Sequence, residues 1–336
     1  MSKKTKGEIK RETEAEVFSA MAAEGHLAEG NTASTLARHL RADPVLVPII
    51  KNKQGPKGRT RLMFAAKEGD LERVRFLLEK GSDPTKEDAD FHSVLYYAAI
   101  GGPDVIDLLV QNGADLDYQN RWGNTALHYA AAYGNLGAVM NLCNAGANVN
   151  KVNDNQNIPL MEALEPIMVR VGNVPHETKT AIVRVLQEAG SDITMKNKQG
   201  STALHLACHD GNVEAVRFLC EADSDVDARD NDGSTPLITL IRNSSLNETP
   251  RLNIIYIVKI LLAYGANPSI EDERRRTLKM FINSEITGDE RLRTLLNETI
   301  DDAMAEGGAA EGGGASRKRR KTRNTRKGRK TRKARS

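Results

Sequence analysis

The spacing of apolar side chains along this chain is that of short amphipathic helices arranged in pairs. Within residues 123–146 two apolar stripes recur at helical spacing. The stripes consist of Leu127, Ala130 and Ala131, followed by Val139, Leu142 and Cys143. Gly134 and Asn135 separate them, and Gly146 ends the second. The pattern predicts a unit of turn, helix, turn, helix.

A short motif with a central leucine recurs six times. It is found at Thr60–Ala66, Ser93–Ala99, Thr125–Ala131, Ile158–Leu164, Thr202–Cys208 and Thr235–Ile241. Its central leucines, Leu62, Leu95, Leu127, Leu160, Leu204 and Leu237, are spaced by 33, 32, 33, 44 and 33 residues. A second marker, Gly-Ala-Asp or a close variant of it, follows each motif. Because one unit cannot bury both of its stripes alone, neighbouring units must stack.

The period and the Thr-x-Leu-His core, seen at Thr125–His128 and Thr202–His205, resemble the ankyrin-repeat family. The resemblance covers residues 53–270. It implies an all-α solenoid of helix-turn-helix units joined by short β-hairpin loops. The six predicted repeats span about 53–85, 86–117, 118–150, 151–194, 195–228 and 229–270.

The flanking segments depart from this period. Residues 1–52 are predicted to form an N-terminal helical cap, and 271–305 a C-terminal cap or degenerate repeat. In the second cap six residues are expected to face inward: Leu278, Phe281, Ile282, Leu292, Leu295 and Leu296. Residues 306–316 read as a Gly-rich flexible linker. Excess residues at 165–175 and 244–252 are either tolerated loop insertions or partner-specific protrusions.

Charge is divided unevenly along the chain. The 336 residues hold 48 Lys and Arg against 45 Asp and Glu, a net charge of +3. Residues 317–336 carry 13 of the basic residues and no acidic one, which leaves 35 basic against 45 acidic in 1–316, a net of −10. The basic residues of this tail are Arg317, Lys318, Arg319, Arg320, Lys321, Arg323, Arg326, Lys327, Arg329, Lys330, Arg332, Lys333 and Arg335. We predict that the tail is disordered.

Four roles for the tail remain open. It resembles a nuclear localisation signal read by importin, and it suits phosphate-dominated contact with nucleic acid or another polyanion. It contains no aromatic residue that would stack on bases. It would also complement the acidic array if it folded back onto it, or it is an inert end.

The composition excludes several classes of protein. No apolar run approaches the length of a membrane span, and no secretory signal or transit peptide is recognisable. Three cysteines form no disulfide framework, which fits a reducing compartment. We therefore expect an intracellular protein of the nucleus or cytoplasm, monomeric and without membrane association.

No constellation for catalysis stands out. The resemblance implies that His128 and His205 are structural and hydrogen-bond between adjacent repeats. Cys208, His209 and Asp210 are contiguous, so they cannot converge as a catalytic relay on one helix. No phosphate-binding, dinucleotide-binding or metal-ligating motif is present. We predict no enzymatic activity, no cofactor and no metal site.

Binding is the better-supported function. The resemblance implies that partners contact the hairpin tips and the inner face of each first helix. Carried over by position, the predicted contacts are Arg121, Trp122, Tyr133, Lys198, Gln199, His209, Asp210, Asn231 and Asp232. Arg121, Trp122 and Tyr133 form the leading cluster, because Trp, Tyr and Arg are enriched at interface hot spots. The alternative is that Trp122 packs on an adjacent hairpin.

The sequence thus predicts a protein-interaction scaffold or adaptor that binds a neutral or basic partner along a concave face. The alternative is a nucleic-acid-associated protein that binds phosphate through its tail.

Overall fold

Seven pairs of antiparallel helices stack side by side in the residues that the computed structural model describes, which are 56–165, 174–243 and 250–311. The first helices of the pairs are α4 (Arg61–Glu68), α6 (Val94–Gly101), α8 (Ala126–Ala132), α10 (Pro159–Leu164), α12 (Ala203–His209), α14 (Pro236–Asn243) and α16 (Leu278–Glu285). The second helices are α5 (Leu71–Glu79), α7 (Ile106–Gln111), α9 (Leu136–Asn144), α11 (His176–Glu188), α13 (Val213–Glu221), α15 (Arg251–Ala263) and α17 (Glu290–Glu311). Short 3-10 turns lie at Pro56–Gly58 and Pro103–Val105.

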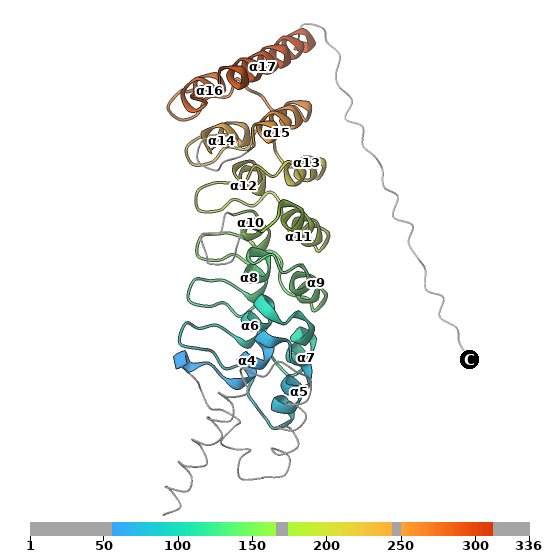
Figure 1. Ribbon diagram of the computed structural model, residues 1–336. Coiled ribbons are helices and arrows are strands. Elements are labelled where there is room, and N and C mark those ends of the chain that lie inside the picture. The colour runs from blue at the N-terminus through green and yellow to red at the C-terminus, as the bar shows by residue number, and fades with distance from the viewer. Residues whose placement is uncertain (1–55, 166–173, 244–249, 312–336) are drawn as a thin grey trace, which may run out of the picture.

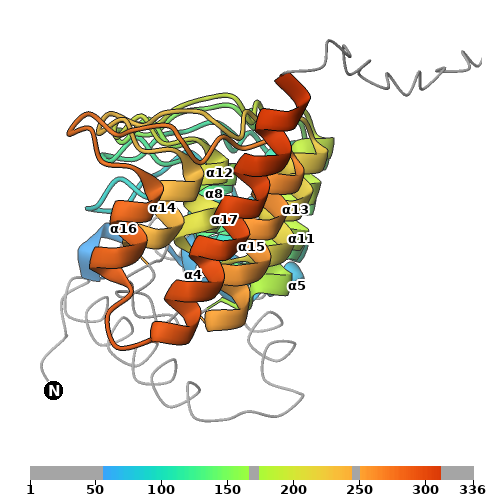
Figure 2. The same cartoon turned by 90° about the horizontal axis from the view of Figure 1, so that it is seen from above.

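The helices form two rows, and the loops between pairs project to one side. The first helices make up the inner row and the second helices the outer row (Figure 1). Seen along the stack, the loops lie over each other beside the inner row (Figure 2). The predicted all-α solenoid is confirmed. The described residues include no β-strand, so the short β-hairpins expected between units are present as hydrogen-bonded loops.

The core runs unbroken through the stack. The six central leucines of the repeated motif are each at most 1% exposed. Small residues beside them, such as Ala66, Ala99 and Ala131, are also buried and let neighbouring inner helices approach closely. Each inner helix therefore packs on the next inner helix as well as on its own outer helix.

An Asp or Asn side chain organises each loop between units. The anchor residues are Asp88, Asn120, Asn153, Asn197, Asp230 and Asp272. In every case the side-chain Oδ1 accepts hydrogen bonds from the backbone N–H groups two and four residues further on. At Asp88, for example, the donors are Asp90 N at 2.9 Å and His92 N at 2.8 Å. The anchor gives all six loops the same path and aims their tips in one direction.

Backbone hydrogen bonds link the tips of successive loops. Ala89 N donates to Lys57 O at 2.8 Å, and Asp154 N donates to Trp122 O at 3.0 Å. Equivalent bonds join Lys198 N to Asn155 O, Asn231 N to Gln199 O and Glu273 N to Asp232 O. The loops of units two and three are joined by an ion pair between Arg121 Nη2 and Asp90 Oδ1 at 2.7 Å.

Two buried histidines fasten neighbouring units, as the resemblance implied. The His128 Nδ1 accepts a hydrogen bond from Thr125 N at 3.1 Å, and its Nε2 donates to the carbonyl of Asn157 at 3.0 Å. His205 repeats the arrangement with Thr202 and the carbonyl of Ser234. Each imidazole is thus used as donor and acceptor at once, which only the neutral ring can do.

The C-terminal segment adds a seventh helix pair to the stack. Asp272 anchors its loop as in the other units, and α16 and α17 pack on α14 and α15. Five of the six residues expected to face inward are buried, but Leu295 is 40% exposed, so that expectation was wrong for Leu295. The helical phase of α17 points Leu292 and Leu296 inward, as expected, and leaves Leu295 on the outer side.

Helix α17 continues to Glu311, into the segment 306–316 that was expected to be a flexible linker. Alanines and glutamates, which favour helix, accompany the glycines there and offset their low helix propensity. The predicted cap at 1–52 and the basic tail lie outside the described residues. So do residues 166–173 and 244–249, which contain most of the two predicted insertions.

Replacing His128 with methionine tests the role of the buried imidazole. Burial lowers the pKa of His128 to about 4. An unfolded histidine keeps a pKa of about 6.5, so between these values the unfolded chain binds a proton that the folded chain excludes. The contribution of the neutral His128 to the free energy of unfolding is therefore fully present above about pH 6.5 and is lost as the pH drops toward 4.

Methionine occupies the equivalent slot in units one and four, as Met63 and Met161, so the variant His128→Met suits the fold. It should lower the free energy of unfolding at pH 7. It should also shrink the loss of stability between pH 7 and pH 5 by about 2 kcal/mol. Urea unfolding at the two pH values measures both effects. An unchanged loss between pH 7 and pH 5 would show that this imidazole is not held neutral.

Candidate functional site

The inner helices and the loop tips together form one continuous face of the solenoid (Figure 2). Most of the predicted contact residues belong to one of these two positions. We describe them first in units two and three, where aromatic residues gather.

We number each loop by the unit that it leads into. Trp122 lies at the tip of the third loop, and Arg121 and His92 contact its ring on two sides. The guanidinium of Arg121 lies 4.1 Å from the Trp122 ring centroid, while its Nη2 pairs with Asp90 in the preceding loop. On the other side the Trp122 ring approaches the His92 ring, with centroids 5.8 Å apart. The indole is still 42% exposed. Trp122 thus packs on the adjacent loop, which was one of its two alternatives, and part of its ring is still exposed.

Further rings continue this contact along the inner helices. His92 stacks on Tyr96 with centroids 3.9 Å apart and planes 17° apart. Tyr96 meets Tyr129 edge to face at 4.6 Å, and Tyr129 approaches Tyr133 at 6.3 Å. These rings come from the second loop, α6 and α8, so stacking of the units is what brings them together. We call Phe91, His92, Tyr96, Trp122, Tyr129 and Tyr133 the aromatic surface.

Phe91 is the most unusual member of the aromatic surface. It stands at the tip of the second loop with φ of 60°, in the left-handed region that disfavours side chains, and it is 47% exposed. The equivalent tip position is glycine in units three, five and six (Gly123, Gly200 and Gly233) and a polar residue in units four and seven (Gln156 and Arg275), all with positive φ. A bulky aromatic residue is thus held in a strained conformation where glycine would serve the fold better.

The buried Asp88 carboxylate holds the aromatic surface in position through hydrogen bonds. The buried carboxylate accepts hydrogen bonds from the Tyr97 hydroxyl at 2.7 Å and from the His92 backbone at 2.8 Å. Burial alone would raise the pKa of Asp88, but these hydrogen bonds hold it below its usual value. The ionised Asp88 therefore fixes the position of His92, on which Tyr96 and Trp122 pack.

Three possible metal ligands meet at this loop. Asp88, Asp90 and His92 offer atoms within 4.8 Å of one another. Each already has an internal role, because Asp88 anchors the loop, Asp90 pairs with Arg121, and the His92 ring lies between Asp88 and Tyr96. The loop anchor explains why the three side chains are close.

The other predicted contacts fall into two groups. Lys198, Gln199, Asn231 and Asp232 are exposed at the tips of the fifth and sixth loops, as expected. His209 and Asp210 lie at the end of α12 and are only partly exposed.

Asp210 is committed to contacts inside the protein. Its Oδ1 lies 2.5 Å from Nζ of the buried Lys179, and its Oδ2 lies 3.5 Å from Nε2 of His176. The Asp210 carboxylate therefore links units four and five. The exposed tips and the end of α12 are separate from the aromatic surface, so the predicted residues do not form a single cluster.

The cysteines lie in the helices and are screened from solvent. Cys208 and Cys220 are buried and Cys143 is half-buried, and burial raises the pKa of all three thiols. Such thiols remain protonated and poorly nucleophilic at neutral pH.

Among the described residues, no helix combines the length and the apolar composition that crossing a membrane requires.

Two features of the site escaped the sequence analysis. The loop anchors carry a signal that was available, because an Asp or Asn lies five residues before each helix-capping position, as Asn120 does before Thr125. The contribution of Phe91, Tyr96 and Tyr129 had no such signal, since it depends on rings from different units meeting in space.

These features define the class of the protein. It is a helical repeat solenoid whose loops and inner helices expose one elongated face. Within that class, the model for "Ankyrin repeats (3 copies)" matches residues 94–166 and 174–272, and the model for "Ankyrin repeat" matches residues 57–89. The chain belongs to the ankyrin-repeat family.

Solved structures agree with this assignment. The ankyrin-repeat domain of human ASB11 superposes with a TM-score of 0.59 at 21% identity, covering 71% of this chain and 97% of that one. The ankyrin-repeat domain of Bcl-3 gives a TM-score of 0.56 at 22% identity, covering 72% and 99%. At this level of identity the likeness concerns the fold alone.

Curated relatives match over shorter stretches. The chain is 37% identical over 92 residues to serine/threonine-protein kinase 12 of Arabidopsis thaliana, covering 27% of this chain and 20% of the relative. It is 39% identical over 88 residues to human ankyrin repeat domain-containing protein 63, covering 25% and 23%. The match thus spans about a fifth of each relative's length, so the activity of the whole relative does not carry over.

Proposed function

We propose that this protein is a non-enzymatic interaction scaffold that holds another protein along the face formed by its loops and inner helices. The observation that carries the proposal is the aromatic surface of units two and three. Phe91 and Trp122 are both more than 40% exposed and stand at the tips of two successive loops, beside packed rings and an arginine. Exposed, well-packed aromatic residues beside an arginine are the usual composition of an interface hot spot.

The strain at Phe91 supports the same function. Positions held in unfavourable backbone conformations gather at functional sites, because the surrounding structure bears their energetic cost. Here the anchor Asp88 and the packed rings behind it maintain the loop. The surface is therefore preorganised, which limits the entropy lost when a partner binds.

The other predicted contacts extend this face toward the C-terminus. Lys198, Gln199, Asn231 and Asp232 lie on successive loop tips and would contact a partner that follows the stack. Asp210 has a structural role through Lys179. We therefore place the centre of binding at the aromatic surface and a polar rim on the later loops.

The variant Trp122→Ala tests the aromatic surface. It should weaken the protein partner's binding by about 2 kcal/mol, because the indole is a half-exposed ring in a packed cluster. The thermal midpoint should change little, since Trp122 lies outside the leucine core. Isothermal titration calorimetry with the partner and thermal unfolding of the free protein measure the two effects.

Tyr264→Ala is the matched control, because Tyr264 is 45% exposed but lies at the end of the outer helix α15. It should leave binding unchanged. Equal weakening by the two variants would contradict the proposal, and so would a large loss of stability in Trp122→Ala with binding intact.

We further propose that residues 317–336 direct the protein to the nucleus through importin or contact a polyanion. Their 13 basic residues and lack of acidic ones support both roles. If the tail were the main functional element, the protein would act by binding nucleic acid, and the repeats would serve only to carry the tail. The aromatic surface favours the scaffold, because such a packed surface is unnecessary for contact with phosphate.

Deleting residues 317–336 separates these roles. The deletion should abolish nuclear accumulation of a fluorescent fusion and binding to duplex DNA. For the intact chain, DNA binding should weaken about a thousandfold between 50 and 200 mM salt. Binding of the protein partner, measured after nuclease treatment, should persist in the deletion variant and at higher salt. Loss of the partner together with the tail would favour the nucleic-acid-associated reading.

A further inference from the structure

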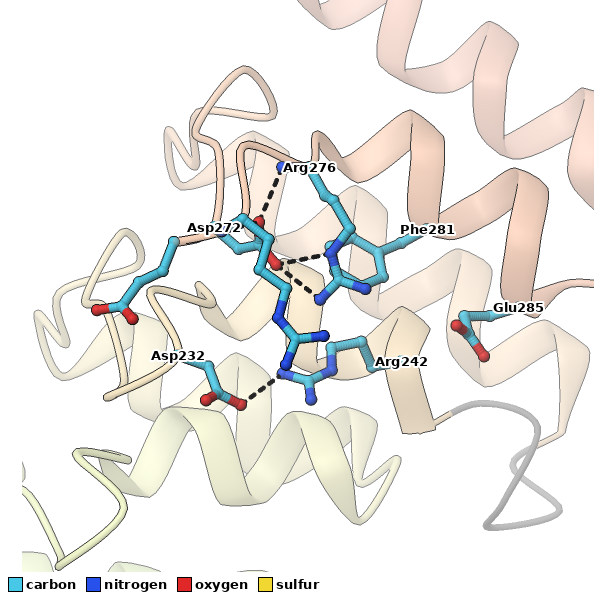
Figure 3. Close-up of a pocket in the computed structure, with 8 residues that line it drawn as sticks. Asp232, Arg242, Asp272, Arg276, Phe281 and Glu285 are labelled. Carbon is cyan, nitrogen blue, oxygen red and sulfur yellow. Dashed lines mark hydrogen bonds and ion pairs between the residues drawn. The ribbon is translucent and has the colours of Figure 1, made fainter.

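A second candidate site lies between units six and seven, away from the aromatic surface. The loop at residues 272–276, Asp232 of the preceding loop, the end of α14, and Phe281 and Glu285 of α16 line a pocket of about 300 Å³ (Figure 3). The residues that line it belong to the loops and the inner helices, the elements that form the face described above. Three arginines, Arg242, Arg274 and Arg276, line it together.

Two of these arginines are fixed in position by the protein. The Arg276 guanidinium pairs with the buried Asp272 carboxylate, with Nη2 and Oδ2 2.8 Å apart, and lies 4.3 Å from the Phe281 ring centroid. Arg242 uses Nη1 to contact Asp232 Oδ2 at 3.1 Å and Ser234 Oγ at 3.0 Å. These contacts engage a single nitrogen of Arg242, so its remaining N–H donors are available to a ligand.

Arg274 has a different environment from the other two arginines. Its backbone N–H donates to Asp272 Oδ1 at 2.9 Å, which places the residue at the pocket. Within the described parts of the chain, its guanidinium forms no ion pair with a carboxylate. Arg274 therefore brings to the pocket a guanidinium without a carboxylate partner, beside two arginines that each have one.

The acidic residues of the pocket limit what it can bind. Asp232 and Asp272 are each matched by one arginine. Glu273 and Glu285 also line the pocket, and Figure 3 shows Glu285 on the far side of Arg242 from Asp232. With four carboxylates against three arginines, the lining as a whole carries no excess of positive charge. A ligand would be selected by directed hydrogen bonds from guanidinium groups rather than by long-range attraction.

We propose that this pocket binds an oxyanion group, a phosphate or a carboxylate, carried by a segment that lies along the same face. Arg274 and the free donors of Arg242 supply the hydrogen bonds, and Arg276 on its Phe281 support closes the site. Planar guanidinium groups bind both oxyanions through paired N–H donors. The site is independent of the aromatic surface, so it can exist even if units two and three bind nothing.

The full chain, labelled with ¹⁵N at arginine, would be titrated with inorganic phosphate and separately with acetate, at constant ionic strength kept with sodium chloride. Side-chain Nε–Hε resonances report on each guanidinium, and the signal missing from Arg274→Gln identifies Arg274. We expect saturable shifts of this signal in the unmodified chain. The Arg274→Gln variant should bind the anion about tenfold more weakly, as judged from the Arg242 and Arg276 signals.

Arg275→Gln is the matched control, because Arg275 is the exposed neighbour that does not line the pocket. Its affinity should stay within about twofold of the unmodified chain. Saturation by phosphate alone would identify a phosphorylated group as the ligand, and equal saturation by acetate an acidic one. The proposal is overturned if neither anion gives saturable shifts, or if the two variants weaken binding alike.

Discussion

The side-chain anchor of each loop is the interaction on which the rest of this structure depends. One Asp or Asn oxygen accepts two backbone N–H groups, so the chain reverses along the same path in every unit. Because the paths are equal, successive tips can hydrogen-bond to each other, as Asp154 N does to Trp122 O. The inner helices then stack one on the next, and a continuous core and a continuous outer surface follow from that repetition.

Units two and three use this regular frame for an irregular surface. Tyr96 occupies the slot that His128 and His205 fill in their own units, and it contacts His92 and, in the next unit, Tyr129 through its ring. Phe91 stands where three other loops have glycine and two have a polar residue. Each departure gives up a stabilising feature of the repeat and adds an aromatic ring to one face. Departures of this kind are expected where function rather than folding determines the residue.

The sequence was a good guide where one unit contains the whole signal. The central leucines and the helix caps depend on short-range spacing, and all six leucines are buried. The histidine bridges join neighbouring units and were expected from the family resemblance. It was a poor guide where position depends on other units or on helix phase. Leu295 was expected inside and lies outside. Trp122 was recognised at a tip, but its contact with His92 joins residues of two units. The pocket at Arg274 likewise requires α14 and α16 to be placed first.

The most direct test of the account is to measure stability and partner affinity together for Phe91→Gly, with Phe91→Ala as the control. Glycine relieves the left-handed strain, so Phe91→Gly should raise the free energy of unfolding by about 1 kcal/mol relative to Phe91→Ala. Both variants should bind the protein partner more weakly than the unmodified chain, because the exposed ring is gone. A gain in stability with weaker binding cannot arise from misfolding. Unchanged affinity in both variants would contradict the claim that the aromatic surface is the binding site.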